Sequence, residues 1–282
     1  IPLNPIKAAA DGDMLGIIFW SILFGFSITR LSGKPQEFFT NFFAYGFKAM
    51  MKLTQGIIAL LPIGVFGLIT TAVANSGIDV FKAVGKYIIT IFLGLSFHFL
   101  VILPLVFFIF TKISPLKHWK AMASAFATAF STSSSGATLP VTIDCIENNV
   151  GVSNRTTSFV LPLGATINMD GTALYECAGV LFISQALGIE LSISQQVVVV
   201  MTAFLASVGA AAVPSAGLVM IFIVLGAVGL GDHPGAGVIV GTMLAVDRPL
   251  DMYRTMVNVA SDSIGAVVVA KSEGESNLYP NN

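Results

Sequence analysis

Residues 247–262 read DRPLDMYRTMVNVASD and lie within a long, otherwise apolar stretch, roughly Gly235 to Ala270. In an α-helix at about 100° per residue, six polar side chains of this stretch share an arc of about 100°. A charged side chain that faces lipid at a helix centre costs about 2.5–3.5 kcal/mol. The polar stripe is therefore expected to face the protein interior or an aqueous cavity. Its six members are Asp247, Asp251, Arg254, Thr255, Asn258 and Asp262.

The chain around this stripe is strongly apolar. Of its 282 residues, 55% are hydrophobic and 10% are charged, with 14 Lys plus Arg against 15 Asp plus Glu and a net charge of −1. A soluble globular domain carries roughly 25% charged residues. The composition therefore indicates an integral membrane protein. Without an excess of positive charge, nucleic acid is not an expected partner.

Three charge-poor stretches read as ordinary membrane helices, because a bilayer core needs about 20 mostly apolar helical residues to cross. They are Met14 to Thr29, Leu53 to Ile78 and Tyr87 to Thr111. We therefore expect a multi-pass protein of a plasma or bacterial inner membrane. His98, inside the third stretch, is expected to be a packed and hydrogen-bonded histidine.

The next stretch, Ala121 to Ile143, is uncharged but polar at its centre, where residues 131–140 read STSSSGATLP. Each apolar arm beside that centre is about half a span long. Irregular backbone at membrane depth must be buried in protein or line a wet cavity. The pattern predicts a re-entrant helix–turn–helix hairpin over about 113–150.

A second interrupted stretch, Leu191 to Gly231, carries no charge and is punctuated by SVGAAAVPSAG at 207–217. Two ordinary helices joined by a turn fit this length equally well. The small, nonpolar break favours a second hairpin over about 192–230. Paired interrupted segments point to the binding site of a secondary transporter.

Between the two hairpins, Thr156 to Gly188 is a span interrupted by NMDGT at 168–172. The glycine and the acidic residue predict a broken helix over about 153–189. Local unwinding frees main-chain carbonyls to bind a cation. A final helix is predicted over about 235–271.

The candidate site has more carboxylates than basic groups. Three Asp of the final helix and Asp170 face a single Arg254. An internal salt-bridge network around Arg254 is the alternative interpretation, but these charges do not balance, and the excess calls for cations. Oxygen ligands without thiols or imidazoles suit alkali or alkaline-earth ions.

Three motifs occur in order: SSSGATLP at 133–140, NMDGT at 168–172, and DMYRTMVN at 251–258 followed by Asp262. Together they resemble the glutamate transporter family, the dicarboxylate/amino acid:cation symporters, over nearly the whole chain. The resemblance implies an all-α polytopic membrane protein with an elevator fold, two re-entrant helical hairpins and broken transmembrane helices.

The resemblance also implies how the chain is divided. Residues 1–80 would form part of a scaffold and trimerisation region, 81–272 a transport domain, and 273–282 a flexible, exposed tail. The family forms homotrimers in the lipid bilayer. It also places further helices before the region that begins at Ile1.

Individual roles follow from the same resemblance. Arg254 would pair with the side-chain carboxylate of the substrate, and Asp251 would receive its ammonium group. Further substrate contacts would come from Ser134, Ser135, Thr172, Val213, Thr255 and Asn258. Sodium ions would be held by Gly164, Thr166, Asn168, Asp170, Ser207, Val208, Ala210, Asn258 and Asp262.

We therefore predict a transporter rather than an enzyme, with sodium-coupled symport of aspartate or glutamate by an elevator mechanism. An acidic amino acid would find a partner for each of its three charges, since arginine favours carboxylates and helix N-termini attract anions. The alternatives are a proton-coupled C4-dicarboxylate symporter and an ion channel. An intramembrane serine hydrolase is disfavoured, because the motifs contain no histidine to act as its base.

Some positions depart from the family patterns. Glu176 matches animal members, whereas archaeal sodium-only members have Gln, and its apolar neighbours favour a neutral carboxyl that could carry a coupled proton. Animal members have Arg after the residue equivalent to Asp251, where this chain has Met252. Archaeal members have Arg ahead of the serine run, where this chain has Ser133. Arg248, one turn before Asp251, is the candidate to replace either arginine, which leaves potassium counter-transport open.

Overall fold

The structure is a computed structural model that describes residues 4–10, 14–58, 79–209 and 216–280, with a few single positions between 60 and 74. All regular secondary structure in these residues is helical. The all-α class is therefore confirmed for the described part of the chain. Two compact units are present, Ile1–Thr71 and Ala72–Asn282.

The first unit contains α1 (Pro5–Ala10), α2 (Met14–Thr29) and α3 (Lys34–Ile58). Helix α2 has the predicted bounds. Helix α3 begins at Lys34, so the predicted start of a span at Leu53 lies inside a helix, and most of 59–78 lies outside the described residues. Helices α2 and α3 contact one another through edge-to-face aromatic pairs that join Phe24 to Phe39 and Phe43.

The second unit begins with one long helical rod. It consists of α5 (Asp79–Phe97), a π-helical turn η1 (His98–Ile102) and α6 (Leu103–Thr111). Pro104 lies in the first turn of α6, where its missing N–H is accommodated by the wider turn before it. Val84–Thr111 is the one helical segment among the described residues that is long and apolar enough to cross a membrane. It corresponds to the span predicted over Tyr87 to Thr111.

The first predicted hairpin has its helix–turn–helix form. Helices α7 (Pro115–Ala121) and α8 (Ala123–Thr132) precede the turn, and α9 (Ser135–Asp144) and the π-helical turn η2 (Cys145–Val150) follow it. Ser133 ends α8 in the left-handed conformation, at φ 53°. The Ser134 hydroxyl then caps α9 by accepting a hydrogen bond from the Ala137 N–H at 3.1 Å. The polar centre of the motif therefore ends one helix and starts the next.

The predicted broken helix is also present, but the break is shorter than expected. Helix α10 (Asn154–Ile167) ends before Asn168 and Met169, and α11 (Asp170–Ala186) begins directly after them. Residues 170–172 thus form the first turn of α11 and are not part of the break. In the second predicted hairpin, the arms are α12 (Ile193–Gly209) and α13 (Ala216–Ala227), while its tip at 210–215 lies outside the described residues.

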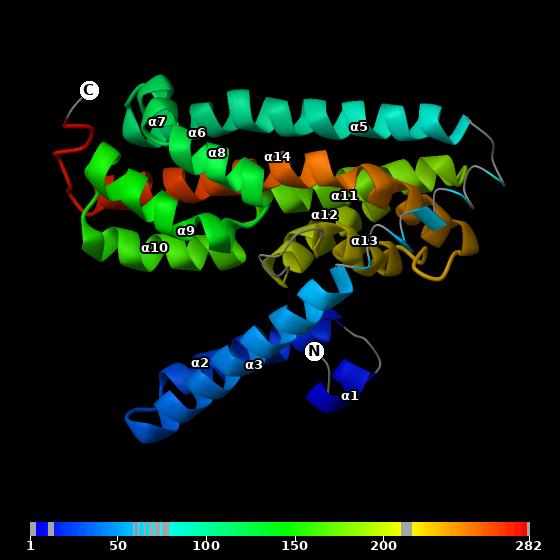
Figure 1. Cartoon of the computed structure of the whole chain (residues 1–282), viewed down its shortest axis with the longest axis horizontal. Coiled ribbons are helices and arrows are strands. Elements are labelled where there is room, and N and C mark those ends of the chain that lie inside the picture. The colour runs from blue at the N-terminus through cyan, green and yellow to red at the C-terminus, as the bar shows by residue number, and fades with distance from the viewer. Residues whose placement is uncertain are drawn as a thin grey trace. The chain divides into compact units, whose positions relative to one another are not determined.

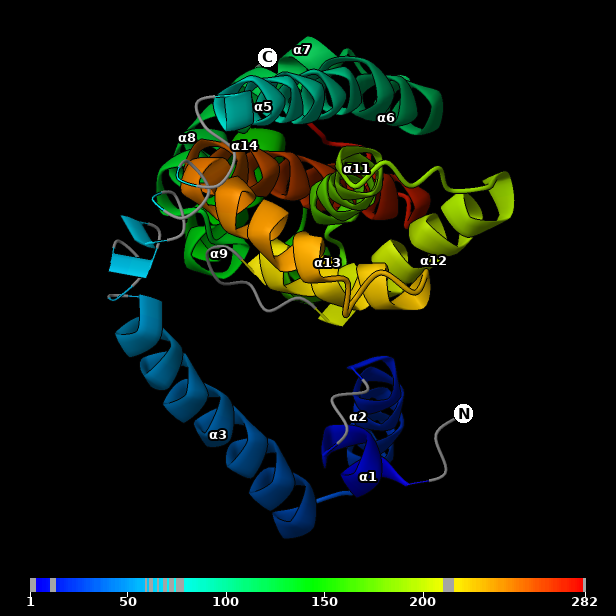
Figure 2. The same ribbon diagram turned by 90° about the vertical axis from the view of Figure 1, so that its right-hand side faces the viewer.

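The final helix, α14 (Pro234–Ser272), runs through the middle of the second unit. It lies beneath α5 and α6 in both ribbon views (Figures 1 and 2) and contacts α8, α9, α10 and α11. With neighbours on several sides, α14 buries its polar residues as well as its apolar ones. All six members of the polar stripe are buried, which confirms that the stripe faces the interior.

The C-terminal tail is not fully exposed. The Tyr279 N–H donates to the Val150 carbonyl at 2.6 Å, and the Tyr279 hydroxyl lies 2.7 Å from Nδ1 of His118. The Tyr279 side chain is consequently buried. The expected exposure of the tail is therefore wrong at this residue, because the chain turns back and packs against α7 and the end of η2.

Candidate functional site

The site forms where the break between α10 and α11 meets α14. Both helices pack against α14. Asn168 and Met169 have non-helical dihedrals, with φ −96° and −117°. The helical ladder is therefore interrupted between the Asn168 N–H, which still donates to the Gly164 carbonyl at 2.9 Å, and the Met169 carbonyl, which accepts from the Ala173 N–H at 2.9 Å.

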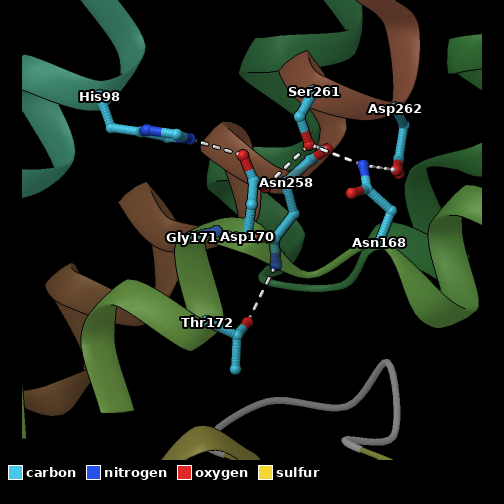
Figure 3. Close-up of polar contacts among 8 residues, drawn as sticks. All are labelled: His98, Asn168, Asp170, Gly171, Thr172, Asn258, Ser261 and Asp262. Carbon is cyan, nitrogen blue, oxygen red and sulfur yellow. Dashed lines mark hydrogen bonds and ion pairs between the residues drawn. The ribbon is translucent and has the colours of Figure 1, made fainter. Parts of the chain in front are cut away.

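Five polar residues at this junction form a connected cluster (Figure 3), which we call the oxygen cluster. It consists of Asn168, Asp170, Asn258, Ser261 and Asp262. Asn258 joins it through its main-chain carbonyl, which accepts from the Ser261 hydroxyl at 3.0 Å. The Asn168 amide donates to Ser261 Oγ at 2.8 Å and to Asp262 Oδ1 at 2.9 Å. The Ser261 hydroxyl in turn donates to Asp170 Oδ1 at 2.7 Å. The cluster thereby ties the helix break to α14.

Asn258 connects the cluster to the first turn of α11. Its side-chain oxygen accepts from the Gly171 N–H at 2.8 Å, and its amide donates to Thr172 Oγ1 at 3.1 Å. Figure 3 shows the contact between the Asn258 amide and Thr172. Asn258 therefore satisfies one of the free N–H groups at the start of α11 and fixes the Thr172 hydroxyl.

The cluster brings carboxylates close to main chain. A methyl group at Gly164 would lie 2.6 Å from Asp262 Oδ1, so only glycine lets α10 approach this carboxylate so closely. Asp262 makes no salt bridge with a described Lys, Arg or His. Carboxylate, amide and main-chain oxygens of this kind are ligands suited to a hard cation such as sodium.

A second polar group surrounds Arg254, and we call it the arginine pocket. It consists of Tyr175, Glu176, Asp247, Asp251 and Arg254. Arg254 Nη2 pairs with Asp251 Oδ1. The guanidinium carbon lies 4.7 Å from the centre of the Tyr175 ring, as in a cation–π contact. The Tyr175 hydroxyl donates to Asp247 Oδ1 at 2.7 Å.

The arginine pocket contains buried polar atoms without a hydrogen-bond partner among the described residues. They are Nε and Nη1 of Arg254, both carboxylate oxygens of Glu176 and Oδ2 of Asp247. Glu176 is fully buried, and the Arg254 side chain is 4% exposed. Buried groups that lack partners are costly, so the pocket is suited to a ligand that supplies a carboxylate to Arg254.

The structure brings together most of the predicted residues on α14 and α11. Asp251, Arg254, Thr255, Asn258 and Thr172 are all buried. The serine motif is built into the start of α9, where Ser135 is buried and Ser134 is half-buried.

The residues predicted for one sodium ion are not brought together by hydrogen bonds between the described residues. Thr166 is exposed, and its hydroxyl bonds within α10 to the Pro162 carbonyl at 2.7 Å. Ser207 is buried and bonds within α12 to the Phe204 carbonyl at 2.9 Å, and Val208 is half-buried beside it. Two further predicted residues, Ala210 and Val213, lie outside the described residues.

Three residues of the site were not predicted as site residues. Ser261 lies only about 20° outside the polar arc of the final helix, so a slightly wider arc would have included it. His98 is hydrogen-bonded as expected, but its partner is Asp170, at 2.6 Å between Nε2 and Oδ2. Tyr175 carries no signal beyond its position next to Glu176, since its role depends on which side of α11 faces Arg254.

Comparison with known proteins gives the family. The model of the sodium:dicarboxylate symporter family matches residues 1–272. An excitatory amino acid transporter of Caenorhabditis elegans is 44% identical over 273 residues, covering 95% of this chain and 53% of the relative. Mouse excitatory amino acid transporter 3 is 45% identical over 264 residues, covering 93% and 49%. Mouse excitatory amino acid transporter 2 is 42% identical over 269 residues, covering 93% and 46%. The chain spans about half the length of the curated relatives it matches.

Proposed function

This chain belongs to the sodium:dicarboxylate symporter family, and from that premise we propose that the protein is a secondary active transporter that carries aspartate or glutamate together with sodium. The family consists of symporters and not of enzymes. The observation that carries the proposed substrate is the buried Arg254, two of whose guanidinium nitrogens have no hydrogen-bond partner among the described residues, beside the acidic Asp251. A buried cation next to a buried anion complements a ligand that bears both charges.

The substrate is proposed to bind by exchanging partners with this ion pair. The side-chain carboxylate of the substrate would form an ion pair with Arg254, whose planar guanidinium suits two parallel hydrogen bonds. The ammonium group of the substrate would replace Arg254 as the ion-pair partner of Asp251. Thr172, Thr255 and Asn258 are buried, and Asn258 is hydrogen-bonded to Thr172. These three side chains would supply neutral hydrogen bonds.

The α-carboxylate of the substrate is assigned to the hairpin tips. Ser134 and Ser135 stand at the start of α9, where free N–H groups and the helix dipole favour an anion. Val213 of the second tip would contact the same carboxylate. This assignment follows the motif and the placement of the serines.

Sodium is proposed as a co-transported ion bound at three places. Asp262 with the carbonyls of Gly164, Asn168 and Asn258 would hold one ion, and the close approach of Gly164 to Asp262 supports this set. Asp170 with the Asn168 side chain would hold another. The carbonyls of Thr166, Ser207, Val208 and Ala210 would hold a third ion next to the second hairpin.

A coupled proton is assigned to Glu176. This carboxyl group is fully buried, and neither oxygen has a hydrogen-bond donor among the described residues. Such surroundings disfavour a bare negative charge. Glu176 would therefore exchange a proton when the neighbouring Arg254 gains or loses its substrate.

The proposed movement is that of an elevator in a homotrimeric, multi-pass membrane protein. Residues 81–272 would form the moving transport domain, and 1–80 would belong to the fixed scaffold. The apolar helix over Val84–Thr111 supports placement in a membrane. Both polar clusters lie within the second unit, which supports their transport as one body.

Ion-replacement uptake in liposomes tests the proposed function. The protein is reconstituted, and uptake of labelled aspartate is measured with sodium, potassium or choline outside and at several pH values. We expect saturable uptake that requires sodium and is competed by glutamate. Uptake of succinate driven by a proton gradient without sodium would support the dicarboxylate alternative, and an ohmic current without substrate would support a channel.

A further inference from the structure

Asp251 is contacted by two arginines, one at each carboxylate oxygen. Arg254 Nη2 pairs with Oδ1, and Arg248 Nη1 lies 3.8 Å from Oδ2. The Asp251 side chain is 1% exposed, whereas that of Arg248 is 55% exposed. A carboxylate of the buried pocket is therefore also reached by a positive charge from the surface of the unit.

The position of Arg248 on α14 explains this contact. Residues three apart lie on the same face of a helix, and Arg248 precedes Asp251 by three positions. The long apolar stem of arginine allows its charged end to stay hydrated while it approaches a buried partner. Arg248 can therefore remain beside Asp251 when Arg254 turns to a substrate.

This pairing has a consequence for substrate choice. An amino dicarboxylate brings an ammonium group to Asp251, but Arg248 already compensates part of the negative charge there. The attraction for the ammonium is thereby weakened. A dicarboxylate without an amino group draws Arg254 away and brings no cation in its place, yet Arg248 still leaves a positive charge beside Asp251.

We propose that Arg248 is a specificity-determining residue that narrows the preference of this transporter for amino dicarboxylates over dicarboxylates without an amino group. The inference rests on the proposed function, because it takes Asp251 as the acceptor of the substrate ammonium. The pair has one exposed partner, so the expected effect is about two- to fivefold. Salt screens such a pair, so the effect should shrink as ionic strength rises.

The test compares Arg248→Gln, Arg248→Lys and the parent protein in liposomes. Sodium-driven uptake of labelled aspartate is measured in the presence of unlabelled aspartate or succinate, and the ratio of the two inhibition constants is determined. We expect Arg248→Gln to raise the preference for aspartate over succinate about two- to fivefold, and less in added choline chloride. Arg248→Lys keeps the charge and should remain close to the parent.

Arg155→Gln is the matched control. Arg155 is exposed in the first turn of α10 and makes no salt bridge with a described residue. The Arg155→Gln variant removes the same charge from the same unit without changing a contact of Asp251. Its preference for aspartate over succinate should therefore equal that of the parent. If net charge alone mattered, the preference ratio would change equally in Arg248→Gln and Arg155→Gln, and this result would overturn the inference.

The outcomes separate the two hypotheses. A parent protein without sodium-driven aspartate uptake contradicts the proposed function. A parent that takes up aspartate, together with an unchanged preference ratio in Arg248→Gln, overturns the role of Arg248 alone. If Arg248→Gln gives no measurable uptake, protection against thermal unfolding by aspartate and by succinate in detergent supplies the same ratio and decides between the outcomes.

Discussion

The oxygen cluster and the arginine pocket both take side chains from α11 and α14, but their burial and their hydrogen bonding differ. The five residues of the arginine pocket are buried, whereas Asn168, Asp170 and Ser261 of the oxygen cluster are half-buried. In the oxygen cluster, hydrogen bonds connect the side chains of Asn168, Asp170, Ser261 and Asp262, and the Ser261 hydroxyl also donates to the main-chain carbonyl of Asn258. In the arginine pocket, five buried atoms of Arg254, Glu176 and Asp247 lack a hydrogen-bond partner among the described residues. The first group is a preformed frame that a small cation can join, whereas the second group is completed only by a charged ligand or a proton.

The difference has a cause in the backbone. The oxygen cluster is built around the break at Asn168 and Met169, where the chain can bring amides and main-chain groups toward α14. The arginine pocket is formed by side chains of the intact helices α11 and α14. Intact helices satisfy their own main-chain groups, so side chains alone must complete the pocket.

The largest expected effect is that of removing the cation from the arginine pocket. Arg254→Ala deletes the proposed partner of the substrate carboxylate and leaves Asp251 without its buried arginine. Breaking a buried charge pair of this kind costs roughly 2–5 kcal/mol, so aspartate affinity should fall by about two orders of magnitude or more. Concentration-dependent uptake of labelled aspartate measures this change, and neutral amino acids should be tested as replacement substrates.

Gly217→Ala separates the position of Arg254 from its charge. A methyl group at Gly217 would overlap the Arg254 guanidinium, so the side chain must move although its charge remains. Aspartate affinity should fall in this variant too, but less than in Arg254→Ala. Unchanged affinity in both variants would refute the assignment of Arg254 to the substrate.

Removing one charge from the oxygen cluster should act on sodium. In Asp262→Asn, an amide replaces the carboxylate next to Gly164 and Asn168, and the site loses the negative charge that a cation needs. The sodium concentration for half-maximal uptake should rise by at least about tenfold. Asp144→Asn makes the same substitution at an exposed aspartate and should leave the sodium requirement unchanged. An equal sodium requirement in Asp262→Asn and the parent would contradict the proposed ion site.

Much of this architecture could be predicted from the sequence because a bilayer restricts the choices. The serine-rich centre at 131–140 predicted a turn between two short helices, and the predicted break at 168–172 begins at the observed position but extends three residues too far. The start of α3 could not be found in this way. Its first turns contain Lys34 and Glu37, and a search for charge-free spans excludes a helix that begins with charged residues.

The site was predictable where one helix carries it and less so where several meet. Spacing on a single helix placed the polar stripe of α14 toward the interior, because helical geometry fixes which side chains share a face. Contacts between helices, such as His98 with Asp170 and Arg254 with Tyr175, depend on how η1, α11 and α14 pack. Packing of this kind is not encoded in the spacing of any one segment.

Glu176 offers a way to test whether an unpartnered group in the arginine pocket carries a proton. In Glu176→Gln, the side chain stays polar and of similar size but can no longer exchange a proton. We expect sodium-dependent uptake whose variation with pH is lost, whereas Glu190→Gln at an exposed position should keep the parent profile. If uptake by the parent already shows no dependence on pH, the proton assignment is wrong.

The smallest effect is expected at a third polar group, the tail clamp, formed by Glu275, Ser153 and Thr156. Glu275 accepts from the Ser153 N–H at 2.8 Å, the Ser153 hydroxyl at 2.6 Å and the Thr156 hydroxyl at 2.7 Å. Its carboxylate is therefore fully partnered, unlike that of Glu176, and serves as a reference for a polar group with a structural role.

Burial alone would raise the pKa of Glu275, but hydrogen bonds from Ser153 and Thr156 outweigh it and hold the pKa below its usual value. A lowered pKa in the folded chain means that the clamp contributes its full stability above the pKa of an unfolded glutamate. This contribution is lost as the pH falls through the lowered value. Protection of the Ser153 amide hydrogen, measured as its exchange rate relative to the intrinsic rate at the same pH, should thus be lower in Glu275→Gln at neutral pH, and should fall in the parent only under acid conditions. Glu273→Gln, at an exposed neighbouring position, should behave like the parent.

Because the clamp lies outside both polar clusters, aspartate affinity should stay unchanged in both variants. A large loss of affinity in Glu275→Gln would show that the tail acts on the site.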